Sequence, residues 1–337
     1  GPKELTVDQK NAITRFLSSP KETTLLEGVT GSGKTEVYLA IAEHYIQQGK
    51  SVLFLVPEIS LTPMMIEYFT YRFPEQTAIL HSELTPAQKY DEYRRIAQGK
   101  AKIVVGARSA IFAPLKDLGL IILDEEHVET YKQDNAPCYH ALEVAKWRAK
   151  EEGARILLGS ATPSLESRAR ALKGVYDYIQ LPHRIHQVEL PKTEIINLLD
   201  PGSVDKESVL FSLSLRKAIQ ETLDKKEQVV LLLNRRGYAP YVTCRKCGYV
   251  FKCPHCDIAL SYHKEDNMLK CHHCDYVLLA PSSCPDCGSS YLSKQCFGTE
   301  RIEEEVQRLF PTARTLRLDS DVSKIRQNVE KILKKFQ

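Results

Sequence analysis

The sequence has no apolar run long enough to cross a membrane, since a membrane-spanning helix needs about 18 consecutive apolar residues. It also lacks low-complexity tracts, and its first residues show no basic segment followed by an apolar one, the pattern of a secretory leader. Neither sign of charge is in large excess, since 46 basic residues face 43 acidic ones and the net charge is +3. This weakly basic balance permits a nucleic-acid partner without requiring one. With 43% hydrophobic and 26% charged residues, the composition predicts a soluble globular protein. The short apolar runs predict no membrane partner, and the arrangement of the cysteines predicts the reducing cytoplasm.

Cysteine is scarce outside one short region. Of ten cysteines, eight form four C-x-x-C pairs, and a two-residue gap lets both thiolates of a pair face one ion. Two pairs complete the tetrahedral sulfur shell that Zn²⁺ favours, so this arrangement predicts a reducing compartment rather than a disulfide framework. We therefore expect two structural zinc sites held by Cys244, Cys247, Cys253, Cys256, Cys271, Cys274, Cys284 and Cys287. Cys138 and Cys296 fit no pair and are expected to be small core residues.

At 337 residues the chain exceeds one ordinary domain. Its first half alternates short apolar runs with longer helical patterns, which is typical of a parallel α/β sheet covered on both faces. The expected strands are Thr23–Glu27, Ser51–Val56, Thr77–Leu80, Lys102–Gly106, Leu118–Leu123 and Ala154–Gly159. The expected helices are Val7–Leu17, Glu36–Gln48, Ser60–Tyr71, Pro86–Gln98, Ala141–Glu152 and Ser164–Leu172.

The second half is interrupted. A polar segment with prolines and glycines, residues 181–208, predicts a connector between two units. A second α/β unit is expected to open with a helix at Leu213–Leu223 and a strand at Gln228–Leu233. After the cysteine-rich region it is expected to resume with a helix at Arg301–Leu309 and a strand at Thr315–Leu318.

Residues 28–35, GVTGSGKT, match the G-x-x-x-x-G-K-[ST] pattern between an expected strand and an expected helix. Glycines let backbone N–H groups close around phosphate oxygens, and a helix N-terminus favours their charge. Lys34 is expected to reach the β- and γ-phosphates of a nucleotide, and the Thr35 hydroxyl to bind Mg²⁺. The expected nucleotide-binding residues are Gln9, Gly28, Thr30, Gly31, Ser32, Gly33, Lys34 and Thr35.

Residues 124–127, with the sequence DEEH, directly follow an expected strand. Asp124 suits Mg²⁺ coordination, and Glu125 suits orienting and deprotonating an attacking water. Such a run of acids, seen alone, is more often a solvated turn. Ser160 and Thr162, in the sequence GSATPS, follow another expected strand and supply two hydroxyls, although this sequence alone is a common turn.

The order of these motifs resembles the motif set of superfamily 2 helicases. In such helicases a segment like Leu5-Thr6-x-x-Gln9 reads adenine, and Gln9 is expected to bond to the N6/N7 edge of the base. A lone glutamine on an N-terminal helix is otherwise unremarkable.

Signs of a nucleic-acid partner are fewer. Tyr131 and Tyr139 follow the DEEH sequence, and aromatic side chains among cations suit base stacking and phosphate contact on a single strand. Trp147, on an expected helix, is expected to pack in the core, while Arg108 suits a phosphate or a carboxylate equally well. The residues expected to contact DNA or to couple it to the nucleotide are Arg108, His127, Tyr131, Tyr139, Ser160, Thr162, Arg235 and Arg236.

Several segments together resemble the bacterial family of replication-restart helicases. They are GVTGSGKT, VPEISLT, GARSAIF, DEEH, GSATPS, LLLNRRGYAP, the four C-x-x-C pairs and FGTERIEEE. The resemblance implies an ATP-dependent 3′-to-5′ DNA helicase that uses ATP with Mg²⁺, binds two Zn²⁺ and acts at stalled or recombined forks. The partners it implies are single-stranded and forked DNA, primosome proteins and the single-stranded DNA-binding protein.

The resemblance also implies which cysteines share an ion. The implied outer set is Cys244, Cys247, Cys284 and Cys287, and the implied inner set is Cys253, Cys256, Cys271 and Cys274. The spacing agrees, because only five residues separate Cys247 from Cys253, which leaves little room for the hairpin that sequential pairing needs. The fourteen residues between Cys256 and Cys271 are close to the usual ribbon spacing.

The sequence departs from this family in three ways. Compared with the family, we expect this sequence to lack the N-terminal DNA-end-binding and winged-helix regions and the late motifs of the second lobe with their arginine finger. We therefore expect this chain by itself to hydrolyse ATP poorly. Cys138 and Leu142 stand where arginines are expected, and residues 323–327 also differ.

The expected fold is α/β: a RecA-like P-loop NTPase lobe joined to a partial second RecA-like lobe, which a small two-zinc ribbon interrupts. The expected ranges are 5–180 for the first lobe, 181–208 for the connector, 209–240 and 296–337 for the second lobe, and 241–295 for the zinc insert. Two other functions stay open. One is a zinc-dependent module that binds forks or partners without turnover, and the other is an RNA-directed superfamily 2 ATPase.

Overall fold

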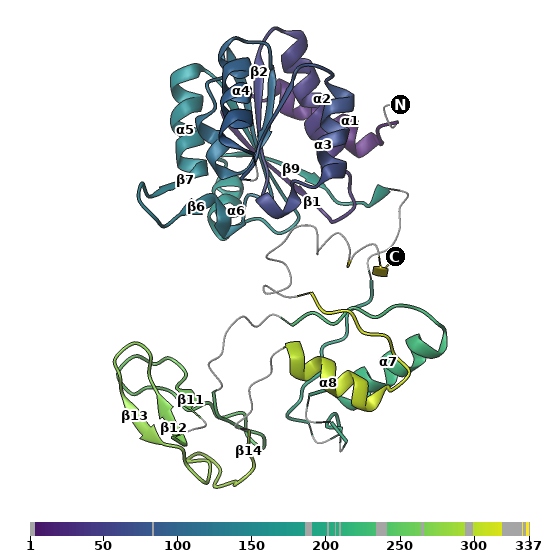
Figure 1. Ribbon diagram of the computed structural model, residues 1–337, viewed down its shortest axis with the longest axis vertical. Coiled ribbons are helices and arrows are strands. Elements are labelled where there is room, and N and C mark those ends of the chain that lie inside the picture. Colours follow the sequence, from purple (N-terminus) through teal and green to yellow (C-terminus); the bar gives the residue numbers. More distant parts are fainter. Residues whose placement is uncertain are drawn as a thin grey trace. The chain divides into compact units, whose positions relative to one another are not determined.

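The computed structural model of the chain divides into two compact units, Gly1–Pro191 and Lys192–Gln337, and each is described by itself (Figure 1). The structure describes residues 4–82, 84–185, 191–200, 202–205, 207–208, 210–233, 241–263, 266–293, 299–318, 332 and 335–336. Within these ranges, no helix has both the length and the apolar character that crossing a membrane requires.

The first unit is built on one parallel sheet of seven strands in the order β3-β4-β2-β5-β8-β1-β9. The strands are β1 Thr23–Gly28, β2 Ser51–Leu55, β3 Thr77–Leu80, β4 Ile103–Gly106, β5 Leu118–Asp124, β8 Arg155–Ser160 and β9 Asp177–Leu181. The six strands expected from the sequence are confirmed, each to within one residue at either end. The edge strand β9 was not expected.

Six helices cover the two faces of this sheet (Figure 1). One face carries α1 Val7–Ser18, α2 Lys34–Gln47 and α3 Pro63–Arg72, and the other carries α4 Pro86–Ala97, α5 Ala141–Glu152 and α6 Leu165–Leu172. Thr6 and Thr85 begin α1 and α4 with capping boxes, in which a glutamine three residues later returns the hydrogen bond. All six helices expected in this half are confirmed, although α3 begins three residues later than expected.

Trp147 does not lie in the core, so that expectation was wrong. Its side chain is 65% exposed, because α5 turns Leu142, Ala145 and Ala149 toward the sheet and Trp147 lies on the opposite side of the helix. Three short 3₁₀ helices complete the unit: η1 Glu58–Ser60, η2 Arg108–Phe112 and η3 Glu129–Tyr131.

Among its described residues, the second unit has the helices α7 Leu213–Asp224 and α8 Thr299–Leu309 and a region of short antiparallel strands. Both helices were expected. In the cysteine-rich region, β10 Thr243–Cys244 pairs with β14 Leu292–Ser293, and β11 Ser261–His263, β12 Met268–Lys270 and β13 Val277–Leu279 form a second small sheet. Its small core includes Val242, Leu260 and Leu269.

Two strands expected in this unit were wrong. Residues 228–233 and 315–318 are irregular, and none of the described residues pairs with either run. Leu232 is 91% exposed and Leu318 is 49% exposed. An apolar run becomes a strand only when a neighbouring strand completes its hydrogen bonds, so the apolar pattern alone misled the prediction.

Candidate nucleotide site and metal centres

Three motifs meet at the carboxyl edge of the parallel sheet. The GVTGSGKT loop follows β1, Asp124 ends β5 and Ser160 ends β8, and these three strands are neighbours in the order β5-β8-β1. In the sheet register, Asp124 lies opposite Gly159 and Glu27 lies opposite Ser160. Ligands of open α/β sheets bind at this edge, so residues distant in the sequence converge on one candidate site.

The GVTGSGKT loop has the features of a phosphate cradle. Lys34 curls over it and its Nζ donates to the carbonyl oxygen of Gly28 at 3.1 Å. The Ser32 hydroxyl is buried, and among the described residues it has no hydrogen-bond partner. A Cβ atom at Gly28 would lie 2.7 Å from that hydroxyl and would fill the cradle. An orphaned hydroxyl and a lysine inside such a loop are groups that a phosphate satisfies, so the loop fits a nucleotide.

The other loop residues lie where the motif predicts. Thr30 and Gly31 form the turn before α2, Gly33 is its N-cap residue with a φ of 77°, and Thr35 is its second residue. Thr35 therefore presents its hydroxyl from the first turn of the helix, next to the loop. A hydroxyl and a carboxylate are oxygen ligands of the kind Mg²⁺ accepts, so Thr35 and Asp124 fit that ion.

Gln9 is buried against the loop. Its Nε2 donates to the carbonyl oxygens of Ser32 and Gly33 at 3.2 Å each, while its Oε1 accepts from the N–H of Thr6 at 2.8 Å. Gly33 has a φ of 77°, which favours glycine, and a Cβ atom there would lie 2.4 Å from Nε2 and displace Gln9 from the loop. Gln9 thus supports the loop, and it would have to exchange these partners to contact adenine.

Asp124 and Glu125 occupy different environments at the end of β5. Asp124 accepts a hydrogen bond from the Tyr38 hydroxyl at 2.9 Å. Burial raises the pKa of Asp124 above its ordinary value, although the Tyr38 hydrogen bond and the Lys34 charge oppose this rise. Glu125 follows with a φ of 48°, and its side chain is 34% exposed. Asp124 is thus fixed and close to Lys34, while Glu125 is partly exposed and its Oε2 lies 3.6 Å from His127 Nδ1.

His127 and Ser160 join β5 to β8. His127 Nδ1 lies 2.7 Å from the Ser160 hydroxyl, which also accepts from the N–H of Thr162 at 2.9 Å. Ser160 is fully buried, whereas Thr162 is exposed. Ser160 therefore connects the two motifs, and of the two hydroxyls only that of Thr162 is exposed to a ligand.

Glu126 joins the DEEH sequence to α6, a role that the sequence analysis missed. Its buried carboxylate accepts hydrogen bonds from the N–H of Ser164 at 2.7 Å and from the hydroxyls of Ser164 and Ser167 at 3.0 and 2.8 Å. Negative charge at a helix N-terminus is favourable, so Glu126 and Ser164 together fix the start of α6. The only sequence signal was the Ser-x-x-Ser spacing that follows GSAT.

Arg108 holds the segment between β5 and α5, which forms a small hairpin of β6 Lys132–Gln133 and β7 Tyr139–His140. Its Nη1 donates to the carbonyl oxygens of Thr130 and Lys132 at 3.1 and 2.6 Å, and its Nη2 donates to Gln133 Oε1 at 3.0 Å. The expected partner was a phosphate or a carboxylate. In the structure Arg108 binds oxygens of this segment, and its contact with a phosphate stays a prediction.

Tyr131 does not offer a stacking surface, so that expectation was wrong. Its side chain is fully buried, and its hydroxyl donates to the carbonyl oxygens of Leu55 and Asp124 at 3.1 and 2.6 Å. Packing of the segment against the sheet explains this burial. Tyr131 thus braces the backbone at Asp124.

Tyr139 is half-buried, and its ring meets that of Phe112 edge to face at a centroid distance of 5.0 Å. Cys138 is exposed, contrary to the expectation of a core residue, because it lies in the loop of the hairpin. Arg235, Arg236 and Cys296 lie outside the described residues, as do residues 323–327.

A pocket of about 840 Å³ adjoins the candidate site. It lies at the carboxyl ends of β2, β3 and β4, beside the segment that Arg108 holds. The ionisable residues in its lining are Glu58, His81, Lys89, Tyr93, Arg108, Glu129, Tyr131, Lys132 and Asp134. Three basic side chains in the lining are thus matched by three carboxylates, and Lys132 is itself paired with Asp134 at 3.0 Å.

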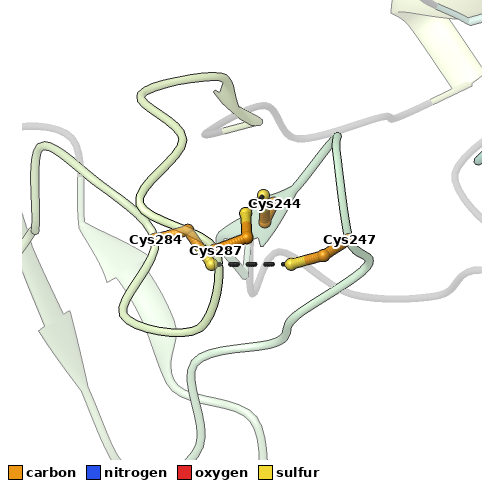
Figure 2. A group of neighbouring side chains, drawn as sticks. All are labelled: Cys244, Cys247, Cys284 and Cys287. Atoms are coloured by element: carbon orange, nitrogen blue, oxygen red, sulfur yellow. Dashed lines mark hydrogen bonds between the residues drawn. The ribbon is translucent and has the colours of Figure 1, made fainter.

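The eight paired cysteines form two clusters, and Figure 2 shows the sulfurs of the first pointing toward one another. The clusters are Cys244, Cys247, Cys284 and Cys287, and Cys253, Cys256, Cys271 and Cys274. Within each cluster the sulfurs lie within 4.8 Å of one another. Two S···S distances in the first cluster are 3.6 Å, and one in the second is 3.5 Å. A tetrahedron with Zn–S bonds of about 2.3 Å has edges of about 3.8 Å, so both clusters fit Zn²⁺ in the nested arrangement.

All four cysteine pairs share one turn. The first cysteine accepts from the N–H of the residue four positions later, as in Gly248 to Cys244 at 2.9 Å. That fourth residue has a left-handed φ of 80°, 53°, 58° and 69° at Gly248, Asp257, Asp275 and Gly288. Glycine and aspartate adopt this conformation more readily than most residues. The sequence C-x-x-C-[GD] thus carries the turn that aims both sulfurs at one ion.

Comparison with known proteins agrees with both sites. The family model described as DEAD/DEAH box helicase matches residues 6–171, and the one described as PriA DNA helicase Cys-rich region (CRR) domain matches residues 253–277. Replication restart protein PriA of Bacillus subtilis (strain 168) is 46% identical over 339 residues, covering 99% of this chain and 42% of the relative. PriA of Chlamydia pneumoniae is 44% identical over 342 residues, covering 99% and 46%.

This chain belongs to the PriA family. It spans less than half the length of the two PriA relatives above. The Cys-rich match contains all four cysteines of the inner cluster, and the DEAD/DEAH match contains the GVTGSGKT, DEEH and GSAT sequences. Among solved structures, RecG bound to a three-way DNA junction is 28% identical over 54% of this chain and 24% of RecG, with a TM-score of 0.40, which adds nothing to the assignment.

Proposed function

We propose that this chain is the motor and zinc region of an ATP-dependent 3′-to-5′ DNA helicase that acts at stalled or recombined forks to restart replication. The observation that supports this most is the convergence of the GVTGSGKT loop, Asp124 and Ser160 on adjacent strands β1, β5 and β8. Its relatives in the PriA family are named replication restart proteins. We place the protein in the cytoplasm.

Hydrolysis would use the carboxyl edge of the sheet. Lys34 and the Ser32 hydroxyl, which lacks a partner in the described part of the chain, bind the β- and γ-phosphate oxygens. Asp124 and Thr35 hold Mg²⁺, which when bound offsets the phosphate charge. Glu125 orients a water and accepts its proton, while the water oxygen bonds to the γ-phosphorus and the bond to the ADP oxygen breaks.

Single-stranded or forked DNA would bind the pocket at the ends of β2, β3 and β4. Lys89, Arg108 and Lys132 line it beside Glu58, Glu129 and Asp134, and these three cations suit a phosphate backbone. Arg108 also holds the segment whose Tyr131 hydroxyl binds the backbone of Asp124. DNA that displaced this segment would therefore act on the Mg²⁺ ligand, which offers a route from DNA binding to ATP hydrolysis.

The remaining candidate contacts to DNA are Tyr139, Thr162, Arg235 and Arg236. We further propose the zinc clusters as the contact for forks, for primosome proteins and for the single-stranded DNA-binding protein. Small metal-held turns suit this role, because the metal fixes the fold of a surface that has little core.

Unwinding of forked DNA by the complete gene product tests this function. Glu125→Gln should still bind MgATP, yet lose hydrolysis and unwinding by about 10²-fold or more, because no base accepts the proton of water. The matched control is Glu143→Gln, which removes a carboxylate from the ion pair that Glu143 makes with Lys146 on α5, and should behave as wild type. Unwinding that survives Glu125→Gln, or that prefers RNA duplexes to DNA, would contradict the proposal.

A further inference from the structure

Tyr38 reaches the candidate site from beneath the GVTGSGKT loop, although no sequence motif includes it. It lies on α2, one turn after Thr35, and its side chain is fully buried. Its ring packs edge to face on Phe54 of β2 at a centroid distance of 5.6 Å. Its hydroxyl donates to Asp124 Oδ1 at 2.9 Å, so one residue of the phosphate-loop helix holds a carboxylate at the end of β5.

Gly159 makes room for this hydroxyl. It lies on β8 directly opposite Asp124 in the sheet register. A Cβ atom at Gly159 would lie 1.6 Å from the Tyr38 hydroxyl oxygen and 2.6 Å from Cζ. Neither distance is possible, so the position of Tyr38 requires a residue without a side chain beside Asp124. The hydroxyl therefore occupies a place that two neighbouring strands leave open for it.

Tyr38 and Tyr131 hold different parts of Asp124. The Tyr131 hydroxyl binds the backbone carbonyl at 2.6 Å, whereas the Tyr38 hydroxyl binds the side chain at 2.9 Å. Tyr131 thus fixes where the end of the strand lies, while Tyr38 fixes how the carboxylate is turned. Only the second contact controls the direction in which the carboxylate oxygens point.

We propose that Tyr38 is a positioning residue that orients Asp124 toward Mg²⁺ and thereby links the phosphate-loop helix to the metal. The inference rests on the proposed function, in which Asp124 is a Mg²⁺ ligand. Hydrogen bonds to a ligating carboxylate fix its orientation in advance, and removing such a partner typically costs 10-fold to 100-fold in metal affinity. The Tyr38 hydroxyl does the orienting, and the aromatic ring without it would not hold the carboxylate.

The Mg²⁺ dependence of nucleotide binding tests this role. Tyr38→Phe keeps the ring and removes the hydroxyl, so the Mg²⁺ concentration that half-saturates binding of a fluorescent ADP should rise about tenfold. Binding of the same ADP without Mg²⁺ should not change. The matched control is Tyr68→Phe, which also removes a tyrosine hydroxyl from a carboxylate of α2, that of Glu36, and should leave the Mg²⁺ dependence unaltered.

A double-mutant cycle separates positioning from general support. In an Asp124→Asn background, Tyr38→Phe should have no further effect on the Mg²⁺ dependence, because the carboxylate it orients is gone. Equal Mg²⁺ dependence of wild type and Tyr38→Phe would overturn the proposal, as would a loss of Mg²⁺-free binding or of cooperative unfolding in Tyr38→Phe. If wild-type binding itself ignored Mg²⁺, the proposed function would fail instead.

Discussion

At the scale of single residues, His140 controls the start of a helix. It is the N-cap of α5, and its Nδ1 accepts a hydrogen bond from the N–H of Leu142 at 3.2 Å. The imidazole is half-buried, and burial lowers the pKa of His140 below its ordinary value, with the neighbouring Glu143 opposing this shift. A protonated imidazole has no acceptor, so only the neutral form caps the helix.

We therefore expect acid to weaken the first unit through His140. Because its folded pKa is depressed, its contribution is complete above the unfolded pKa of about 6.5 and is lost as the pH falls through the folded value. His140→Asn keeps a capping side chain that does not titrate, so it should reduce the drop in urea midpoint between about pH 7.5 and about pH 5.5. His140→Gln removes both the cap and the titration, so it should cost about 1 kcal/mol at about pH 7.5 and less at about pH 5.5, where the wild type also begins to lose the cap. An unchanged pH dependence in His140→Asn would contradict this role.

Residues with a motif were easier to predict than residues without one. Lys34 and Asp124 could be placed from the sequence because a fixed spacing and a preceding strand determine where they lie. Tyr131 and Trp147 could not, because the exposure of an aromatic side chain depends on which side of its segment packs on the sheet. Tyr38 had no signal at all, since its role arises from an open space beside Gly159 on another strand.

At the scale of elements, burial decided which strands could be predicted. The central strands of the first unit are covered on both faces, so each is a nearly continuous apolar run. Such runs made the strands and their ends predictable from the sequence. β9 lies at an edge with a mixed burial pattern, and the hairpin strands β6 and β7 have two residues each, too few for a pattern. Residues 228–233 have the apolar pattern of a strand but pair with none of the described strands. A sequence by itself does not show whether a partner strand is present.

The nested zinc clusters make an element-scale prediction. Cys271→Ala should bind one Zn²⁺ per chain instead of two, because it removes a ligand of the inner cluster and none of the outer one. Metal binding is coupled to the folding of such turns, so only the inner region should unfold and nucleotide binding should persist. Elemental analysis of the purified protein checks the count, and X-ray absorption checks for an all-sulfur shell. Loss of both ions, or nitrogen in either shell, would contradict the nested assignment.

At the scale of the whole molecule, the candidate nucleotide site and the two cysteine clusters belong to two different units. Every described residue of the candidate nucleotide site lies within Gly1–Pro191, and all eight clustered cysteines lie within Lys192–Gln337. The sheet of the first unit is held by its own two cores, while the cysteine region has only a small core and depends on its metal. A substitution that destroys one of these sites should therefore leave the other site intact.

Equilibrium binding of a fluorescent MgATP analogue to this chain tests the central claim most directly. Lys34→Ala removes the cation that curls over the phosphate loop, so affinity should fall about tenfold to a hundredfold while the zinc content stays at two. Lys146→Ala, which removes a lysine from the ion pair with Glu143 on α5, should bind as wild type does. If Lys34→Ala bound the nucleotide as tightly as wild type, the carboxyl edge of β1, β5 and β8 would not be the nucleotide site.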